Sequence, residues 1–167
     1  RGKGPQVLDL PTSDAATDSF WKLGVQICYE SLYPEFSESL VKQGAQILIN
    51  LTNDSWFSQN HGFEFMRTSS EAYQHMYMTL ARAIETRRPL LRSTNTGITT
   101  AITAGGEILT QGPTQTEWFH FFEVPVSQSP PTTFYTRWGA WLMIIPFLIL
   151  VLLYGAQAVR TRSEKSS

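Results

Sequence analysis

The chain has 167 residues, 13 Lys plus Arg against 14 Asp plus Glu, and a formal net charge of -1. This balance gives no electrostatic reason to expect a nucleic-acid partner. The composition, 42% hydrophobic and 16% charged, excludes a disordered or collagen-like chain, and the length suits one domain with a core of ordinary size. The single cysteine, Cys28, excludes an internal disulfide framework and a C-x-x-C metal site.

Two strand-like segments with a short helix between them come first in the predicted fold. Residues 21–27 are rich in strand formers, and residues 46–51 form a second apolar run. Residues 34–43 predict a helix, with Pro34 in its first turn and Gly44 after its end. Strand, helix, strand is a βαβ unit, so we expect the two strands to be parallel neighbours.

A longer helix is predicted from Phe65 to Arg87, because apolar residues recur on one face and Pro89 ends the pattern. The rest of the domain is strand-like, and residues 127–133 form a linker that contains Pro130-Pro131. The expected strands, with a Gly105-Gly106 turn among them, cover residues 90–94, 98–103, 107–110 and 117–126.

The C-terminal part contains an uncharged apolar stretch from Trp138 to Ala156. At about 1.5 Å per residue it covers the roughly 30 Å of a hydrocarbon core, which predicts a transmembrane helix; the alternative is a buried helix of a soluble core. Basic residues follow the stretch, so the positive-inside rule predicts an exported domain, a membrane helix and a cytoplasmic basic tail. These three parts cover residues 1–136, 137–157 and 158–167.

The chain begins at Arg1, and the residues that follow lack the layout of a secretory signal. An exported domain needs an export signal or an earlier membrane span. We therefore expect this chain to be the C-terminal part of a longer protein.

Polar residues follow the two predicted parallel strands, where reactive groups gather in open α/β sheets. Cys28 ends the first strand, and Asn53 and Asp54 follow the second. A lone cysteine is more often a small buried hydrophobe than a nucleophile. The position of Cys28 before Tyr29 and Glu30 favours the nucleophile, which would need a base or cation nearby and oxyanion donors.

The three histidines, His61, His75 and His120, share no spacing typical of a metal site. We expect each to be an ordinary surface or core residue. No metal ion and no cofactor is predicted.

Three ordered motifs resemble the carbon-nitrogen hydrolase (nitrilase) superfamily. They are Gly-Val-Gln-Ile-Cys-Tyr-Glu at residues 24–30, Asn-Asp-Ser-Trp-Phe at residues 53–57, and Ala-Arg-Ala-Ile-Glu-Thr-Arg-Arg-Pro-Leu-Leu-Arg-Ser-Thr-Asn-Thr-Gly at residues 81–97. Within the superfamily, Cys-Tyr-Glu, Asn-Asp-x-Trp-Phe and a C-terminal membrane helix are most similar to the bacterial apolipoprotein N-acyltransferase family.

The resemblance implies an α/β fold, the C-terminal portion of a nitrilase-like αββα sandwich, followed by one transmembrane helix. It implies a Glu-Lys-Cys triad at the periplasmic face of the bacterial inner membrane, with Cys28 as the nucleophile. In the family, the cysteine takes an acyl chain from a phospholipid donor as a thioester. It then passes the chain to the α-amino group of a diacylglyceryl-modified apolipoprotein. The thioester divides one difficult transfer into two easier steps.

The resemblance also implies roles for the neighbours of Cys28. Glu30 matches a supporting carboxylate, with a solvated strand-end carboxylate as the alternative, and Tyr29 matches the aromatic residue beside the thiol. A second set matches a loop that shapes the substrate pocket or its lipid entrance: Asn53, Asp54, Trp56 and Phe57. The Trp56-Phe57 pair is equally well explained as a core plug. Structural ion pairs are expected for Arg82, Glu85, Arg88 and Arg92.

The chain departs from the family in one respect, because the base Glu and the Lys of the triad belong upstream of Cys28. No Glu precedes Glu30, and neither Lys3 nor Lys22 stands in the family's lysine motif. We therefore expect the chain by itself to be inactive. Two alternatives remain: a membrane-tethered amidase that uses the same cysteine, and a non-catalytic anchored remnant.

Overall fold

The computed structural model describes residues 4–12, 20–55 and 70–165. The chain divides into two compact units, Arg1–Thr133 and Phe134–Ser167. Trp56, Phe57 and His61 lie outside the described residues. The first unit carries the sheet and the predicted site, and the second is a single helix.

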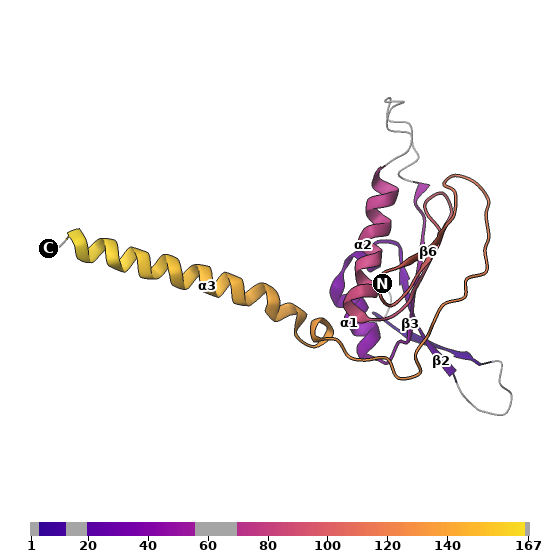
Figure 1. Cartoon of the computed structure of the whole chain (residues 1–167), viewed down its shortest axis with the longest axis horizontal. Helices are drawn as coiled ribbons and strands as arrows, with labels where there is room; N and C mark the ends of the chain where they lie inside the picture. Colours follow the sequence, from indigo (N-terminus) through magenta and orange to yellow (C-terminus); the bar gives the residue numbers. More distant parts are fainter. Residues whose placement is uncertain (1–3, 13–19, 56–69, 166–167) are drawn as a thin grey trace, which may run out of the picture. The chain divides into compact units, whose positions relative to one another are not determined.

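The first unit is built on a mixed sheet whose six described strands lie in chain order (Figure 1). β2, β3 and β4 are parallel, and β1, β5 and β6 add to the two edges in antiparallel fashion. Leu23 pairs with Ile47 and Ile27 with Leu51, which confirms the predicted parallel neighbours. The strands are β1 (Val7–Pro11), β2 (Phe20–Ile27), β3 (Ile47–Thr52), β4 (Leu90–Thr94), β5 (Thr100–Ile102) and β6 (Ile108–Gln111).

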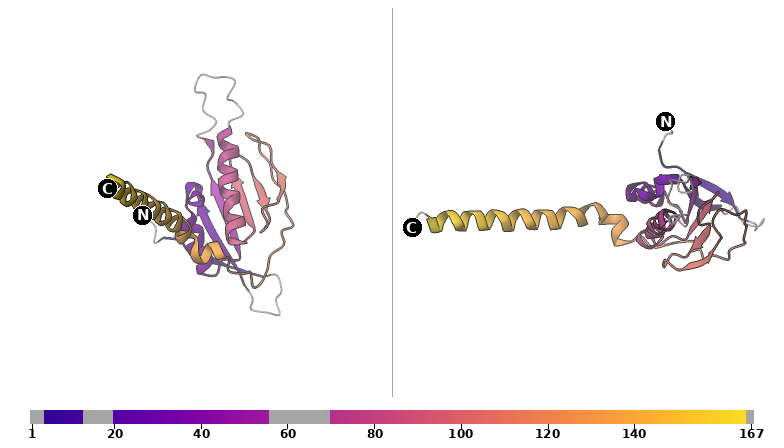
Figure 2. Two further views of the ribbon diagram at one scale, coloured as in Figure 1. Left: turned by 60° about the vertical axis from the view of Figure 1, so that its left-hand side comes forward. Right: turned by 90° about the horizontal axis from the view of Figure 1, so that it is seen from above.

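Two helices, α1 (Pro34–Lys42) and α2 (Ser70–Thr86), lie side by side on one face of the sheet (Figure 2). α1 begins at Pro34, whose fixed φ suits a first helical turn, and the chain leaves it through Gly44 in the left-handed region (φ 98°). Both features were predicted. A 3₁₀ turn, η1 (Cys28–Leu32), connects β2 to the residue before α1.

The core lies between the helices and the sheet. Its buried side chains come from both layers: Leu40, Val41, Ala45, Leu48, Ala83, Leu90 and Ile102. Leu48, Leu90 and Ile102 stand next to one another across β3, β4 and β5, so they form one apolar row. Each of these three side chains is fully buried, which contributes roughly 1.5–3 kcal/mol per residue.

Two residues away on the same strands, toward the carboxyl ends of β3 and β4, the row that faces the helices is polar. Gln26, Asn50, Arg92 and Thr100 pair in register across β2, β3, β4 and β5. All four are at most 1% exposed. Side chains alternate between the faces of a strand, so this polar row and the apolar row share one face. A buried row of this kind requires hydrogen-bond partners for each member.

The opposite face of the sheet is covered less completely. Ile27 is 53% exposed and Leu51 is 44% exposed. The described residues thus form one sheet and one helical layer, which confirms the predicted α/β class. The second sheet and second helical layer of an αββα sandwich stay a prediction.

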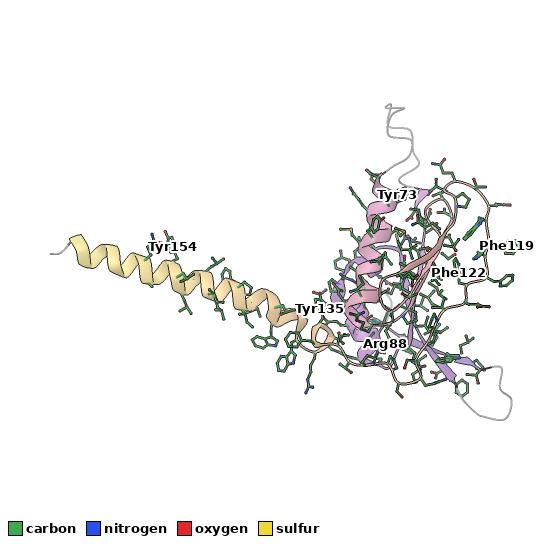
Figure 3. The ribbon with its side chains drawn as sticks, in the orientation of Figure 1. Tyr73, Arg88, Phe119, Phe122, Tyr135 and Tyr154 are labelled. Atoms are coloured by element: carbon green, nitrogen blue, oxygen red, sulfur yellow. The ribbon has the colours of Figure 1, made fainter. Side chains whose placement is uncertain are left out.

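Two details of the strand prediction were wrong. β1 was not predicted, and it pairs with β2 from Val7 opposite Gly24 to Pro11 opposite Phe20. Residues 117–126, predicted as a strand, form no described strand. Phe119 points away from the sheet (Figure 3) and is 81% exposed. Alternating apolar residues favour an extended chain, but a strand also needs a neighbour for its backbone hydrogen bonds.

The second unit is the helix α3 (Phe134–Lys165), which continues through Pro146. Its large apolar side chains are exposed along much of its length, from 41% at Leu142 to 78% at Tyr154. Judged by length and hydropathy, the described residues include no helix that could cross a membrane. The predicted membrane span is therefore not confirmed.

Candidate active site

Cys28 occupies a sharp turn where β2 ends and η1 begins. Its backbone is in the left-handed region (φ 52°), which costs a residue with a side chain about 1–2 kcal/mol. Strain of this kind persists only where the surroundings hold it, and it concentrates at functional sites. A strained turn from strand to helix also presents the nucleophile beyond the sheet in α/β-hydrolases. The half-buried thiol of Cys28 therefore has the backbone setting of a nucleophile.

Hydrogen bonds hold this turn on both sides. The carbonyl of Cys28 accepts from Asn50 Nδ2 at 3.1 Å and from Ser31 Oγ at 3.1 Å. Glu30 Oε2 accepts from the backbone N–H of Ile27 at 2.7 Å. The structure thus places the Glu30 carboxylate on the backbone one residue before Cys28, where it ties the turn together. Its role as a supporting carboxylate stays a prediction.

A buried charged cluster lies behind the turn, at the ends of β3 and β4. Asp54 Oδ2 accepts from Arg92 Nη2 at 2.7 Å, and Asp54 Oδ1 lies 3.0 Å from His75 Nδ1. A carboxylate can only accept, so Nδ1 of His75 carries a proton. The three side chains are at most 3% exposed. Burial alone raises the pKa of Asp54, but the His75 hydrogen bond and the Arg92 charge outweigh it and leave that pKa below its usual value.

Arg92 connects this cluster to the Cys28 turn. Its Nη1 donates to Asn50 Oδ1 and, at 3.2 Å, to Thr79 Oγ1. Burial lowers the pKa of Arg92, while the negative charges of Asp54 and of a Cys28 thiolate favour its protonated form. Both carboxylate oxygens of Asp54 are therefore paired with buried side chains in this structure. The predicted role of Asp54 in substrate binding has not been tested.

The aromatic neighbour predicted from the sequence, Tyr29, contacts the same cluster from outside. Its ring is 48% exposed and lies tilted on the His75 ring, with 5.2 Å between centroids. Tyr29 therefore covers His75 while keeping one face toward solvent.

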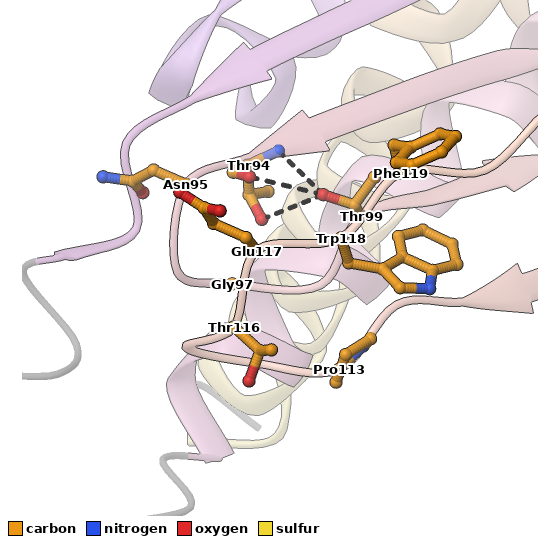
Figure 4. A pocket seen from close by; sticks show the side chains of 9 residues that line it. All are labelled: Thr94, Asn95, Gly97, Thr99, Pro113, Thr116, Glu117, Trp118 and Phe119. Carbon is orange, nitrogen blue, oxygen red and sulfur yellow. Dashed lines mark hydrogen bonds between the residues drawn. The ribbon is translucent and has the colours of Figure 1, made fainter.

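A cavity of about 520 Å³ opens beyond the end of β4 (Figure 4). Asn95 lines it and donates through Nδ2 to Asn53 Oδ1 at 2.7 Å. Asn95 Oδ1 accepts from the backbone N–H of Asp54 at 3.0 Å, so the two loops are tied together. Gly97 is required here, because a Cβ on it would come within 2.7 Å of Asp54 Cγ. Asn53 thus contacts a residue of the cavity wall without lining the cavity itself, and its binding role stays a prediction.

Two other residues considered in the sequence have contacts of a different kind. Lys22 forms an exposed ion pair with Asp9 (3.2 Å) near the start of β2. That position is about 20 Å along the strand from Cys28. His120 stacks on Trp118, with 5.4 Å between ring centroids. Within residues 4–12, 20–55 and 70–165, no group of His, Cys, Asp and Glu side chains could hold a metal ion.

The expected ion pairs are found for three of the four residues. Arg82 pairs with Glu85 at 2.8 Å, and Arg92 pairs with Asp54. Arg88 instead donates to backbone carbonyls, including those of Ala45 at 2.9 Å and Pro131 at 2.8 Å. It therefore ties the end of α2 to the loop before β3 and to the linker.

Comparison with known proteins decides the family. The model of the carbon-nitrogen hydrolase family matches residues 2–127. The chain belongs to the carbon-nitrogen hydrolase family. It is 44% identical over 166 residues to the apolipoprotein N-acyltransferase of Bdellovibrio bacteriovorus, and 36% identical over 153 residues to that of Geobacter metallireducens. These matches cover 99% and 90% of the chain but only 28% and 26% of those proteins.

A solved carbon-nitrogen hydrolase from Helicobacter pylori shares the fold, with a TM-score of 0.50 and 19% identity over 58% of this chain and 38% of that one. The family model thus confirms the predicted superfamily, and the solved structure shows a shared fold. Within the family, the chain is similar in sequence to proteins named apolipoprotein N-acyltransferase.

Sequence reasoning missed the part that His75, Asn50 and Thr79 play behind the turn. The helix α2 places His75 and Thr79 one turn apart on the face that meets the sheet. A signal was present, because buried polar residues at matching positions of neighbouring strands need partners. Asn50 and Arg92 stand at such positions, but their pairing register could not be read from the sequence alone.

Proposed function

We propose that this carbon-nitrogen hydrolase domain carries the nucleophile of an N-acyltransferase. Cys28 would take a fatty acyl chain from a phospholipid and pass it to the N-terminal α-amino group of a diacylglyceryl-cysteine lipoprotein. The observation that carries the proposal is the strained Cys28 turn, found in a chain whose relatives are named apolipoprotein N-acyltransferases.

The reaction has two balanced steps. The catalytic base takes the proton of the Cys28 thiol, and the sulfur attacks the ester carbonyl. A C–S bond forms, the C–O bond breaks, and the lysophospholipid leaves with the proton returned by the base. The amine nitrogen then attacks the thioester carbonyl, an amide C–N bond forms, and the C–S bond breaks to return the thiol. The proton lost by the amine passes to the leaving sulfur or to solvent. A thioester divides one difficult transfer into two easier ones.

Both substrates carry fatty acyl chains, so we place the reaction at a membrane, the periplasmic face of the bacterial inner membrane. The exposed apolar side chains of α3 support contact with lipid. The catalytic base and the Lys of the triad would come from residues outside this chain.

The test uses the product of the intact gene that encodes this chain, incubated with a phospholipid that carries a labelled acyl chain. We expect a label that is released by hydroxylamine and maps to Cys28, absent from Cys28→Ser. Addition of a diacylglyceryl-cysteine peptide should move the label to its amine. Release of free fatty acid to water without transfer would favour the amidase-like alternative, and no label on Cys28 would contradict the proposal.

A further inference from the structure

The left-handed backbone of Cys28 is held from behind by donors on two different elements. Asn50 reaches the Cys28 carbonyl from β3, and Ser31 reaches it from η1. Without such donors, a residue with a side chain favours the extended or right-handed regions. At the Cys28 carbonyl, the conformation that presents the thiol therefore depends on these two contacts, beside the Glu30 hydrogen bond to Ile27.

Asn50 can donate to Cys28 only in one orientation of its amide. Oδ1 of Asn50 accepts from Arg92 Nη1, and a guanidinium has no acceptor atom. The Nδ2 group must therefore face β2, where it donates to the carbonyls of Cys28 at 3.1 Å and of Gln26 at 3.3 Å. Arg92 thus fixes the direction in which Asn50 donates.

Arg92 is itself fixed, and a second set of contacts leads from it to the same carbonyl. Its Nη2 donates to Asp54, and its Nη1 donates to Thr79 Oγ1 at 3.2 Å. The Thr79 hydroxyl lies 3.1 Å from Ser31 Oγ, which also reaches the Cys28 carbonyl. Both supports of the Cys28 turn therefore end at one buried guanidinium.

We propose that Asn50, oriented by Arg92, is a positioning residue that holds Cys28 in the left-handed conformation from which its thiol attacks the acyl donor. Ser31 is the second support, at the same distance from the Cys28 carbonyl. Asn50 lies behind the Cys28 backbone and touches no reacting atom. The catalytic part of this inference rests on the proposed acyl transfer, while the conformational part does not.

The decisive variant is Asn50→Asp, because aspartate has nearly the same shape and still accepts from Arg92 but donates nothing to Cys28. Ser31→Ala removes the other donor to the Cys28 carbonyl, and it disturbs the buried polar row less than Asn50→Asp does. Thr100→Val is the matched control: Thr100 belongs to the same buried row, but its hydroxyl donates to the Thr110 carbonyl at 2.6 Å. It removes a buried hydrogen bond of the same kind without touching the supports of Cys28.

Two readouts separate positioning from general stability. The product of the intact gene is labelled with ¹³C,¹⁵N-cysteine, and the NMR signal of Cys28 is identified by its loss in Cys28→Ser. Its carbon shifts and intraresidue amide-to-α-proton contact report a left-handed backbone. Steady-state kinetics with phospholipid and a diacylglyceryl-cysteine peptide provide kcat and KM.

We expect Asn50→Asp to lose the left-handed signature and to lower kcat by about tenfold or more, since small misplacements of a reacting group have effects of this size. KM for the phospholipid should stay within about twofold, because substrate contacts are unchanged. Ser31→Ala should change both readouts less, and Thr100→Val neither. If Asn50→Asp does not fold, Asn50→Ala, which also removes the Nδ2 donor, is measured in its place.

A left-handed signature that survives in folded Asn50→Asp would overturn the inference. A signature lost without a fall in kcat would also overturn its catalytic part. If the wild-type protein transfers no acyl chain, the proposed function fails, while the NMR readout still tests how Cys28 is held.

Discussion

The Asp54 carboxylate is buried between Arg92 and His75, and its lowered pKa makes stability depend on pH in a defined direction. A carboxyl group with a lowered folded-state pKa contributes fully to the free energy of unfolding above its unfolded value, about 3.9 for Asp. The contribution is lost as the pH falls through that value toward the lower folded pKa. Stability should therefore decline below about pH 4.

We expect Asp54→Asn to lower the free energy of unfolding by about 3 kcal/mol at pH 7, because it leaves Arg92 buried without a carboxylate. The difference from wild type should be smaller at about pH 3, below the unfolded pKa of Asp, because the contribution of a lowered pKa is lost as the pH falls. Urea denaturation at the two pH values measures this. Asp9→Asn, which removes an exposed partner of Lys22, should change little at either pH. A difference that does not vary with pH would contradict the prediction.

At the scale of single elements, the end of α2 contains a residue whose conformation opposes its type. Arg87 follows the helix in the left-handed region (φ 54°), and the N–H of Arg88 donates to the carbonyl of Ala83 at 3.3 Å. This is the pattern of a Schellman motif, in which glycine is the usual residue. Arg87 is exposed, so its side chain does not compensate through packing.

Arg87→Gly should therefore raise the free energy of unfolding by about 1 kcal/mol, because glycine adopts this conformation without a steric penalty. Arg87→Ala is the control: it also removes the guanidinium but keeps the penalty, and it should have little effect. Urea denaturation of the three proteins measures the difference. Equal gains from Gly and Ala would assign the effect to the lost charge and contradict the backbone explanation.

Elements with strong local signals were predicted correctly, and elements that depend on distant partners were not. The helix from Pro34 carries its own start and end signals, and β4 was predicted with its bounds at residues 90–94. β1 depends on pairing with β2, and residues 117–126 lack a neighbouring strand among the described residues. Short strands are determined by tertiary pairing more than by propensity.

The candidate site divides in the same way. The strand pattern and the Cys-Tyr-Glu motif predicted Cys28 at the end of a strand. The parallel pairing of β2 and β3 confirms that this strand and the strand before Asn53 end at the same edge of the sheet. The cluster that supports Cys28 was not predicted as a unit, because its members come from β3, η1, α2 and β4. Arg92 was expected only to form an ion pair. A network that joins four elements through side chains has no signature in local spacing.

At the scale of the whole molecule, the exposed apolar surface of α3 is the largest feature outside the first unit. Apolar patches of this extent mark contact sites for protein or lipid. Leu148 and Leu152 are 51% and 71% exposed. The double variant Leu148→Gln, Leu152→Gln should therefore partition into dodecyl maltoside micelles at least about tenfold more weakly than wild type, since each lost leucine removes roughly 1.5 kcal/mol or more of transfer energy.

Co-sedimentation or gel filtration with detergent measures this partition. The matched control is Leu8→Gln, Leu10→Gln in β1, where two leucines of similar exposure, 54% and 49%, belong to the sheet. We expect this control to bind micelles as wild type does. Equal losses in the two variants would mean that α3 is not the contact surface.

The buried polar row across β2, β3, β4 and β5 also bears on how the chain avoids mispairing during folding. A slip of one residue in β3 would turn Asn50 to the other face of the sheet and bring an isoleucine or a leucine opposite Arg92. The guanidinium would then be buried against hydrocarbon, which costs far more than the loss of one apolar contact. The buried polar residues behind Cys28 therefore also favour the observed strand register over a register shifted by one residue. This is the register that brings the strand ends to the same edge of the sheet.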